Sequence, residues 1–129
     1  MLVMICGSRS ATQDMLQFAS RCVKRAKDRG FSIIVGDAPG VDAHVIELCD
    51  QLGVPVQVIG GYNRLRHQTE QGVNLTLPYN YKLRDNYMLD RADIVIGIWN
   101  TTSYGTLRNI ESAKKIGLPN KLYSAKQPL

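Results

Sequence analysis

The sequence predicts an α/β fold: a single doubly wound, mostly parallel sheet of about five strands with helices on both faces. Short apolar runs alternate along the chain with segments whose apolar residues recur at helical spacing. The runs at residues 31–35 and 94–98 are apolar on both faces, which is typical of parallel strands covered by helices on both sides. Because right-handed crossovers leave few strand orders, we predict the order 3-2-1-4-5.

The first elements along the chain are two strands and two helices. Residues 2–6 form the first strand, because they are apolar and end at a glycine turn. The first helix lies between Thr12, a favourable N-cap, and Gly30, a favourable residue just after a helix end. Residues 31–35 are the second strand, and an apolar stripe predicts the second helix over residues 41–52.

Residues 60–80 interrupt this alternation, because they show no regular apolar period. They follow the third predicted strand, residues 54–59. Long segments of this kind often act as lids, so we consider three roles equally: a lid over a phosphate or base, a short helix over 65–72, or an oligomer contact. The remaining predicted elements are a helix over 82–91, a strand over 93–99, a helix over 106–116 and a short strand over 121–124.

The composition describes one compact domain over residues 1–129. Its 44% hydrophobic content is enough for one core, and no apolar stretch approaches the length of about eighteen residues that a membrane-spanning helix needs. The 3 cysteines form no CxxC pair, which indicates reduced thiols in a cytoplasmic protein rather than disulfides or a metal site. We expect no metal and no cofactor.

The charge balance is compatible with an anionic partner. Lys and Arg total 16 against 11 for Asp and Glu, which gives a formal net charge of +5 and suits an anionic ligand, nucleic acid or an ordinary solvated surface. The sequence has no Lys/Arg-rich run and no repeat of basic and aromatic residues of the kind that binds single strands. Binding of single-stranded DNA is therefore the least favoured hypothesis.

Three loops are predicted to meet at the carboxyl edge of the sheet. Ligands of open α/β sheets bind at this edge, where the strand order reverses, which is here between the first and fourth strands. The loops at residues 7–10, 36–42 and 100–106 are rich in glycine, hydroxyl and amide groups, and each precedes a helix, whose N-terminal N–H groups bind phosphates. Arg9 and Arg84 are candidate anion clamps. Ordinary turns with helix caps are the alternative.

Four short motifs occur in order on these elements. They are Gly7-Ser8-Arg9, Gly36-Asp37-Ala38-Pro39-Gly40-Val41-Asp42-Ala43, Arg84-Asp85-Asn86-Tyr87-Met88 and Ser103-Tyr104-Gly105-Thr106. Over roughly residues 2–123, this arrangement resembles the SLOG superfamily, which includes the DprA and Lonely Guy proteins, and in particular its small stand-alone members. The resemblance implies a Rossmann-like fold, a homo-oligomer, and a nucleotide or ribose phosphate held at the glycine loops.

The main hypothesis is a module that binds a small nucleotide-derived ligand, either ADP-ribose-like or a nucleoside phosphate, and acts as a sensor or sequesters the ligand. The resemblance supports it, because the family includes domains that sense such ligands beside phosphoribohydrolases and a protein that binds single-stranded DNA. The residues predicted from the loops and the resemblance to contact the ligand are Gly7, Ser8, Arg9, Gly36, Asp37, Gly40, Asp42, Arg84, Trp99, Asn100, Ser103, Gly105 and Thr106.

The second hypothesis is an enzyme, an N-glycosidic hydrolase or transferase acting on nucleoside phosphates. Lonely Guy hydrolases carry a PGGxGTxxE loop, whereas residues 100–106 lack the proline and the paired glycines, and Glu111 lies further along than the family's glutamate. Cleavage through an oxocarbenium-like state needs a carboxylate nearby, which Asp42 or Asp37 would supply. The candidate catalytic residues are Asp42 and Arg84. Neither GxGxxG nor GxxxxGK[ST] is present, which argues against an NAD-dependent dehydrogenase and a P-loop NTPase.

Three of the predicted contact residues have structural alternatives. Asp42 either contacts a ribose hydroxyl or caps its own helix. Asp37 occupies a turn that favours aspartate in any case. Trp99 either stacks on a base or packs against a helix.

Overall fold

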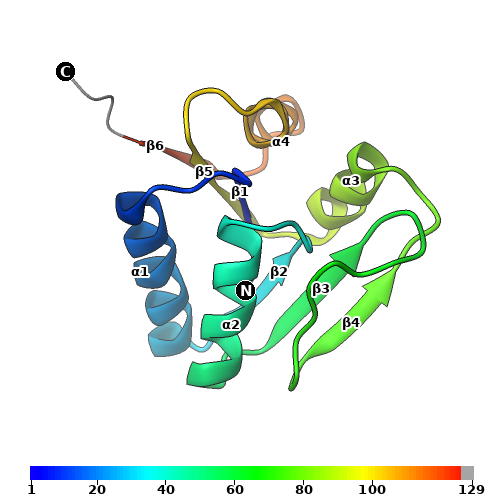
Figure 1. Cartoon of the computed structure of the whole chain (residues 1–129). Coiled ribbons are helices and arrows are strands. Elements are labelled where there is room, and N and C mark those ends of the chain that lie inside the picture. The colour runs from blue at the N-terminus through cyan, green and yellow to red at the C-terminus, as the bar shows by residue number, and fades with distance from the viewer. Residues whose placement is uncertain (126–129) are drawn as a thin grey trace.

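The computed structural model describes residues 1–125 of the chain. Its elements are β1 (Leu2–Gly7), α1 (Gln13–Arg29), β2 (Ser32–Val35), α2 (Val41–Leu52), β3 (Val56–Gly60), β4 (Val73–Thr76), α3 (Tyr81–Arg91), β5 (Ile94–Trp99), α4 (Tyr104–Lys115) and β6 (Asn120–Ser124). Strands and helices alternate along this range except where β4 follows β3 with no helix between them (Figure 1).

Within residues 1–125, six strands form one sheet in the order β4-β3-β2-β1-β5-β6, and all neighbouring strands are parallel. The predicted fold class is confirmed, and the strands foreseen lie in the predicted order as β3-β2-β1-β5-β6. The predicted number of strands was wrong, because β4 extends the sheet beyond β3. Three of the four β4 residues are exposed, so this edge strand leaves no apolar run in the sequence.

The segment at residues 60–80 is more regular than its sequence indicates. After β3 the chain turns through Tyr62 and Asn63, which have positive φ values of 52° and 58°, and it then returns along the sheet as β4. The described residues 65–72 form no helix, so the alternative of a short helix there was wrong. The predicted lid role of the segment stays a prediction.

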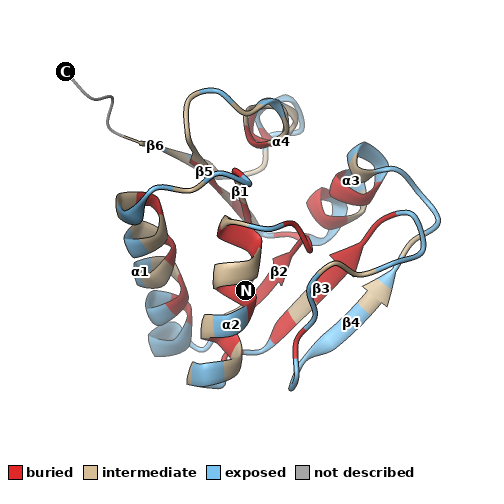
Figure 2. Cartoon of the chain, in the orientation of Figure 1, coloured by how far each residue is buried: buried red, intermediate tan, exposed pale blue. Residues whose placement is uncertain are grey.

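The helices cover both faces of the sheet, with α1 and α2 on one face and α3 and α4 on the other (Figure 1). Side chains of the central strands alternate between two apolar cores. Ile5 and Ile33 belong to the core beneath α1 and α2, whereas Met4 and Ile34 belong to the core beneath α3 and α4. Figure 2 shows the same division, because the buried residues of the helices face the sheet.

The ends of the first two helices follow the signals predicted from the sequence. Thr12 is the N-cap of α1, and Gly30 and Gly53 follow α1 and α2 in the left-handed conformation with φ values of 70° and 73°. Within residues 1–125, all three cysteines are unpaired. The same range contains no helix that is both long enough and apolar enough to cross a membrane.

The register of β1 and β5 brings their carboxyl ends together. The two strands pair from Val3 opposite Ile94 to Gly7 opposite Ile98. Just beyond β1, the N–H of Ser8 donates a hydrogen bond to the carbonyl of Ile98 at 3.1 Å. The strand order reverses between these two strands, so the structure places the loops that follow them side by side.

Candidate functional site

A cavity of about 560 Å³ opens at the carboxyl edge of the sheet, around the ends of β1 and β5. Its walls come from the loops after β1, β2 and β5 and from the first turns of α2, α3 and α4. The predicted contact residues that line it are Gly7, Ser8, Arg9, Gly36, Asp42, Arg84, Asn100, Ser103, Gly105 and Thr106.

Asp37, Gly40 and Trp99 were also predicted contacts, but the structure places them beside the cavity and not in its lining. Asp37 is fully buried. Gly40 has a φ of 84°, and a Cβ there would lie 2.2 Å from the carbonyl oxygen of Arg9, so the close approach of two loops requires glycine. The indole N–H of Trp99 donates to the carbonyl of Ser103 at 2.7 Å, just before α4.

Several lining residues were not among the predicted contacts. Arg66 comes from the segment after β3, and Tyr81 and Asp85 come from α3. Arg108 and Asn109 lie on α4. A sequence signal for the last two exists, because they are three and four residues after Gly105 and thus share a helix face with it. Arg66 has no such signal, since its segment shows no regular period.

The predicted hydroxyl and amide groups of Ser8, Asn100 and Ser103 hold two loops together. The hydroxyl groups of Ser8 and Ser103 share a hydrogen bond of 2.6 Å, and the N–H of Asn100 donates to the Ser8 hydroxyl at 3.0 Å. The side-chain carbonyl of Asn100 in turn accepts from the N–H groups of Thr102 and Ser103. These side chains therefore shape the site by fixing the loop that precedes α4.

The N-terminus of α4 is left uncapped and open. Ser103 is its N-cap residue but makes no side-chain cap hydrogen bond. A Cβ on Gly105, in the first turn, would meet only the Arg108 guanidinium, 4.0 Å away, among the described residues. In contrast, a Cβ on Gly7 would lie 2.4 Å from that of Val41. Gly7 is thus explained by internal packing, whereas Gly105 exposes bare backbone to the cavity.

Two buried carboxylates anchor the arginines of the cavity wall. Asp37 accepts from the backbone N–H and the guanidinium of Arg66 at 2.8 and 2.9 Å, and from Arg84 at 3.0 Å. Asp85 accepts from Arg84 at 2.7 Å and from Arg108 at 3.2 Å. Burial works to raise the pKa of Asp37, but the hydrogen bonds and charge of Arg66, aided by Arg84, outweigh it and hold this pKa below its usual value.

Asp42, in contrast, has no ion-pair partner among the described residues, and its pKa is raised. Its Oδ2 accepts one hydrogen bond, from the N–H of Ala38 at 3.2 Å, and its Oδ1 has no partner. Burial raises the pKa of Asp42 to about 7, against the opposing effect of Arg84. Asp42 does not cap its helix, because Gly40 holds the N-cap position of α2. A carboxyl group whose pKa is about 7 therefore lies in the wall of the cavity, with its unpartnered oxygen covered by protein atoms.

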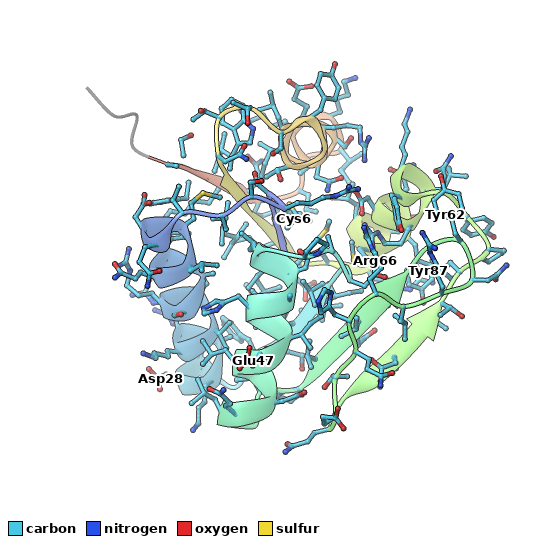
Figure 3. All side chains as sticks on the ribbon, viewed as in Figure 1. Cys6, Asp28, Glu47, Tyr62, Arg66 and Tyr87 are labelled. Carbon is cyan, nitrogen blue, oxygen red and sulfur yellow. The ribbon has the colours of Figure 1, made fainter. Side chains whose placement is uncertain are left out.

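The described residues contain three buried side-chain polar atoms without a partner, and the residues that carry them all line this cavity. These atoms are Asp42 Oδ1, Arg66 Nε and Tyr81 Oη. Figure 3 shows Arg66 in the space between α2 and α3. Because nearly all buried polar groups in native proteins are hydrogen-bonded, their gathering in one cavity indicates a place for a polar ligand.

The remaining chemistry of the cavity is limited. Cys6 lines it, but burial, together with the charges of Asp85 and Asp42, raises the pKa of its thiol far above the usual value. This thiol is therefore not a nucleophile at neutral pH. Across residues 1–125, no three His, Cys, Asp or Glu side chains are grouped so that they could hold a metal ion.

The fold and the cavity together describe a Rossmann-like protein with a polar cavity where the strand order reverses, and solved structures share this fold. The molybdenum cofactor binding protein from the phototrophic bacterium Rippkaea orientalis matches with a TM-score of 0.80 and 19% identity, over 97% of this chain and 77% of that one. The molybdenum cofactor carrier protein from Chlamydomonas reinhardtii matches with a TM-score of 0.80 and 14% identity, over 94% and 74%.

A third match is DNA processing protein A from Helicobacter pylori, whose structure describes single-stranded DNA binding. Its TM-score is 0.70 at 18% identity, and the match covers 100% of this chain and 66% of that one. No protein-family model and no curated protein matches the sequence. At these identities the likeness shows the fold alone, so the Rossmann-like fold that the resemblance implies is confirmed.

Proposed function

We propose that this protein binds a small phosphorylated ligand derived from a nucleotide, either ADP-ribose-like or a nucleoside phosphate, and acts as a sensor or sequesters the ligand. The observation that carries the proposal is the gathering of the unpartnered buried atoms of Asp42, Arg66 and Tyr81 in one cavity. Leaving a buried polar group without a hydrogen bond costs about 1–3 kcal/mol. A polar ligand in the cavity removes that cost.

The cavity also favours an anion. Arg9, Arg66, Arg84 and Arg108 line it, and the lining carboxyl groups of the described chain are those of Asp42 and Asp85. The Arg9 guanidinium makes no hydrogen bond or ion pair with any described residue and so is available to a ligand. The open N-terminus of α4 adds N–H groups and a partial positive charge, as in other phosphate sites.

The comparisons support a ligand site in this fold but not its occupant. Two of the similar structures are named for binding or carrying the molybdenum cofactor and one for binding single-stranded DNA. We favour a small ligand because the cavity is a bounded space of about 560 Å³, which lies within the usual range of small-molecule sites. Homo-oligomerisation and a cytoplasmic location stay predictions.

Thermal melting against AMP, ADP, ADP-ribose, NAD, other nucleoside monophosphates and a short oligonucleotide tests the proposal. A ligand at a hundred times its Kd adds about 2.7 kcal/mol of stability, a shift of several degrees. We expect a nucleotide to give this shift and Arg9→Gln to reduce it. Arg25→Gln, a change on the outer side of α1, is the matched control and should keep it. The proposal fails if no compound shifts the melt, or if Arg9→Gln and Arg25→Gln respond alike.

Asp42 supports a second candidate function, the cleavage of an N-glycosidic bond. Asp42 lines the cavity and has an unpartnered oxygen, and burial raises its pKa to about 7, which suits a group that exchanges protons at neutral pH. Mass spectrometry of the same mixtures separates the two functions. Recovery of the intact nucleotide supports binding alone, and recovery of base and ribose phosphate supports hydrolysis.

A further inference from the structure

The α1 side of the sheet is incompletely covered near β5 and β6. On the opposite side, α4 packs against both of these strands (Figure 1), whereas on the α1 side no described helix has an extensive contact with β6. The burial of β5 reflects this difference. Val95, on the α4 side, is fully buried, but Ile94 and Ile96, on the α1 side, are only half-buried. Apolar side chains of a strand with neighbours on both edges are therefore left without a helix over them.

A groove of about 560 Å³ lies over this uncovered part of the sheet and beside α1. Its floor is mainly aliphatic and includes Val3, Ile94 and Ile96. The lining residues of α1 extend from Phe18 to Arg29, which is about 17 Å along a helix that rises 1.5 Å per residue. The groove therefore has room for about three turns of a further helix alongside α1.

Positive charges line the rim of the groove at a regular spacing. Arg21, Arg25 and Arg29 are four residues apart and form one row along α1, with steps of about 6 Å, and Lys121 lies on β6. Burial raises the pKa of the Cys22 thiol in the groove, while Lys121, Arg21 and Arg25 oppose this effect. Among the described residues, no Asp or Glu lines the groove, and Arg25 and Arg29 make no hydrogen bond or ion pair.

The distribution of these charges distinguishes between possible occupants. A small anion with an apolar tail carries its charge at one end and would meet only one or two of the rim cations. Acidic side chains four residues apart on a helix repeat at the same spacing as the arginine row, so such a helix meets the whole row. A single nucleic-acid strand also repeats its charge, but it needs open aromatic rings for base stacking, and the Phe18 ring already stacks on Tyr123.

A second copy of this chain does not supply such a helix. The chain has a formal net charge of +5, so two copies repel each other. Within residues 1–125, no helix carries two acidic residues four positions apart. The charge pattern of the groove therefore indicates a different protein as the partner.

We propose that this groove is a docking surface for an acidic amphipathic helix of a partner protein. The helix lies along α1, covers Ile94 and Ile96 with its apolar face, and places acidic side chains beside Arg25 and Arg29, with Lys121 on its other side. It completes the helical layer that α1 and α2 form on this face of the sheet. The inference goes beyond the proposed function, because the groove shares no lining residue with the cavity at the carboxyl edge.

Fluorescence anisotropy with a labelled synthetic peptide tests the docking surface. The peptide is a helix of about four turns, or about 14 residues, with leucines on one face and glutamates four residues apart beside them. A peptide of the same composition in scrambled order is its control. We expect saturable binding of the amphipathic peptide that weakens as salt is added, and no binding of the scrambled peptide.

The reactivity of Cys22 locates the bound peptide. Cys22 lines the groove and is only partly buried, whereas Cys6 and Cys49 are buried. Iodoacetamide should therefore modify Cys22 first. We expect the amphipathic peptide to slow this modification, and mass spectrometry of the modified protein measures the rate at each cysteine.

Charge reversal separates recognition from structure. The double variant Arg25→Glu with Arg29→Glu should bind the acidic peptide about tenfold more weakly, because two attractions become repulsions. A peptide with lysines in place of the glutamates should bind this variant better than the wild type. Lys24→Glu is the matched control, because Lys24 is exposed on the same helix but does not line the groove. It should bind the acidic peptide like the wild type, and melting of each variant confirms that it folds.

Several outcomes would overturn the docking surface. They are no binding at millimolar peptide, equal binding of the scrambled peptide, or an equal loss of binding in Lys24→Glu. Protection of Cys22 by dodecanoate or by a short oligonucleotide, but not by the acidic peptide, would assign the groove to a lipid or to nucleic acid instead. Dimerisation that the double variant abolishes would assign it to a second copy. Each of these results leaves the proposed function to its own test, the nucleotide panel.

Discussion

Two hollows of the molecule have the same volume, about 560 Å³ each, but very different chemistry. One is the cavity at the carboxyl edge. The other is a groove beside α1, whose floor includes Phe18 and Phe31 and whose cations are Arg21, Arg25, Arg29 and Lys121. Within residues 1–125, every buried side-chain polar atom without a partner belongs to a residue of the edge cavity, and none belongs to the groove.

Two of the four cations of the groove have partners among the described residues. Arg21 and Lys121 each lie 5.6 Å from the centroid of the Phe18 ring, which stacks on Tyr123. Volume and positive charge are present in both hollows, so neither property by itself identifies a ligand-binding site. What distinguishes the edge cavity is its set of unmade hydrogen bonds and the open helix terminus.

The largest expected effect concerns the buried ion pairs that hold the arginines of the edge cavity in place. Asp37→Ala removes the carboxylate that pairs with Arg66 and with Arg84, whose side chain is only 7% exposed. Loss of one partner of a buried ion pair leaves an uncompensated charge, and we expect the free energy of unfolding to fall by about 3–5 kcal/mol. Urea denaturation measures this. Asp28→Ala, at an exposed position of α1, is the control and should change the free energy of unfolding by less than about 0.5 kcal/mol. Equal losses in the two variants would show that the buried ion pairs of the edge cavity are not more important for stability than an exposed residue of α1.

A smaller effect of opposite sign is expected at Asp42. Its pKa is raised from 3.8 to about 7 in the folded protein, so the folded state binds more protons than the unfolded state between these pH values. Stability from this group is present below pH 4 and is lost as the pH rises to 7. Asp42→Asn should therefore stabilise the ligand-free protein at pH 8 by about 1–2 kcal/mol, with the gain shrinking toward pH 4.

Melting curves of wild type and Asp42→Asn from pH 4 to pH 8 check this prediction. A constant difference across the range would contradict a raised pKa. Combined with weaker ligand binding, the expected gain would mark Asp42 as a residue that serves the cavity at the expense of stability.

The smallest expected effect is at Gly105. Its Cβ position is open, so Gly105→Ala should fold normally and gain about 0.5–1 kcal/mol from the better helix former. The added methyl group nevertheless faces the cavity, and the thermal shift given by a bound nucleotide should decrease. Gly7→Ala is the contrasting variant, because its Cβ would collide with Val41 and should destabilise the fold. A nucleotide shift that Gly105→Ala leaves unchanged would place the phosphate elsewhere.

The sequence predicts those features that depend on regular patterns. Apolar periods and end signals such as Gly30 gave the helices and the order of the five strands foreseen. The edge strand β4 was not predicted, because edge strands bury little apolar surface and Val73 is 57% exposed. The lining loops followed from the topology rule alone. The contact of Arg66 with Asp37 did not, because it joins residues 29 positions apart and Arg66 lies in a segment without a regular period.

The hydrogen bond between Ser8 and Ser103 joins residues 95 positions apart, and this separation has a consequence for biosynthesis. β1 leaves the ribosome first but is the strand that pairs with β5, so it waits for about ten seconds at ordinary rates of translation. Pairing of distant parallel strands is also slow to form. During this interval the apolar strand is uncovered on one edge, which makes the nascent chain a candidate client for chaperones.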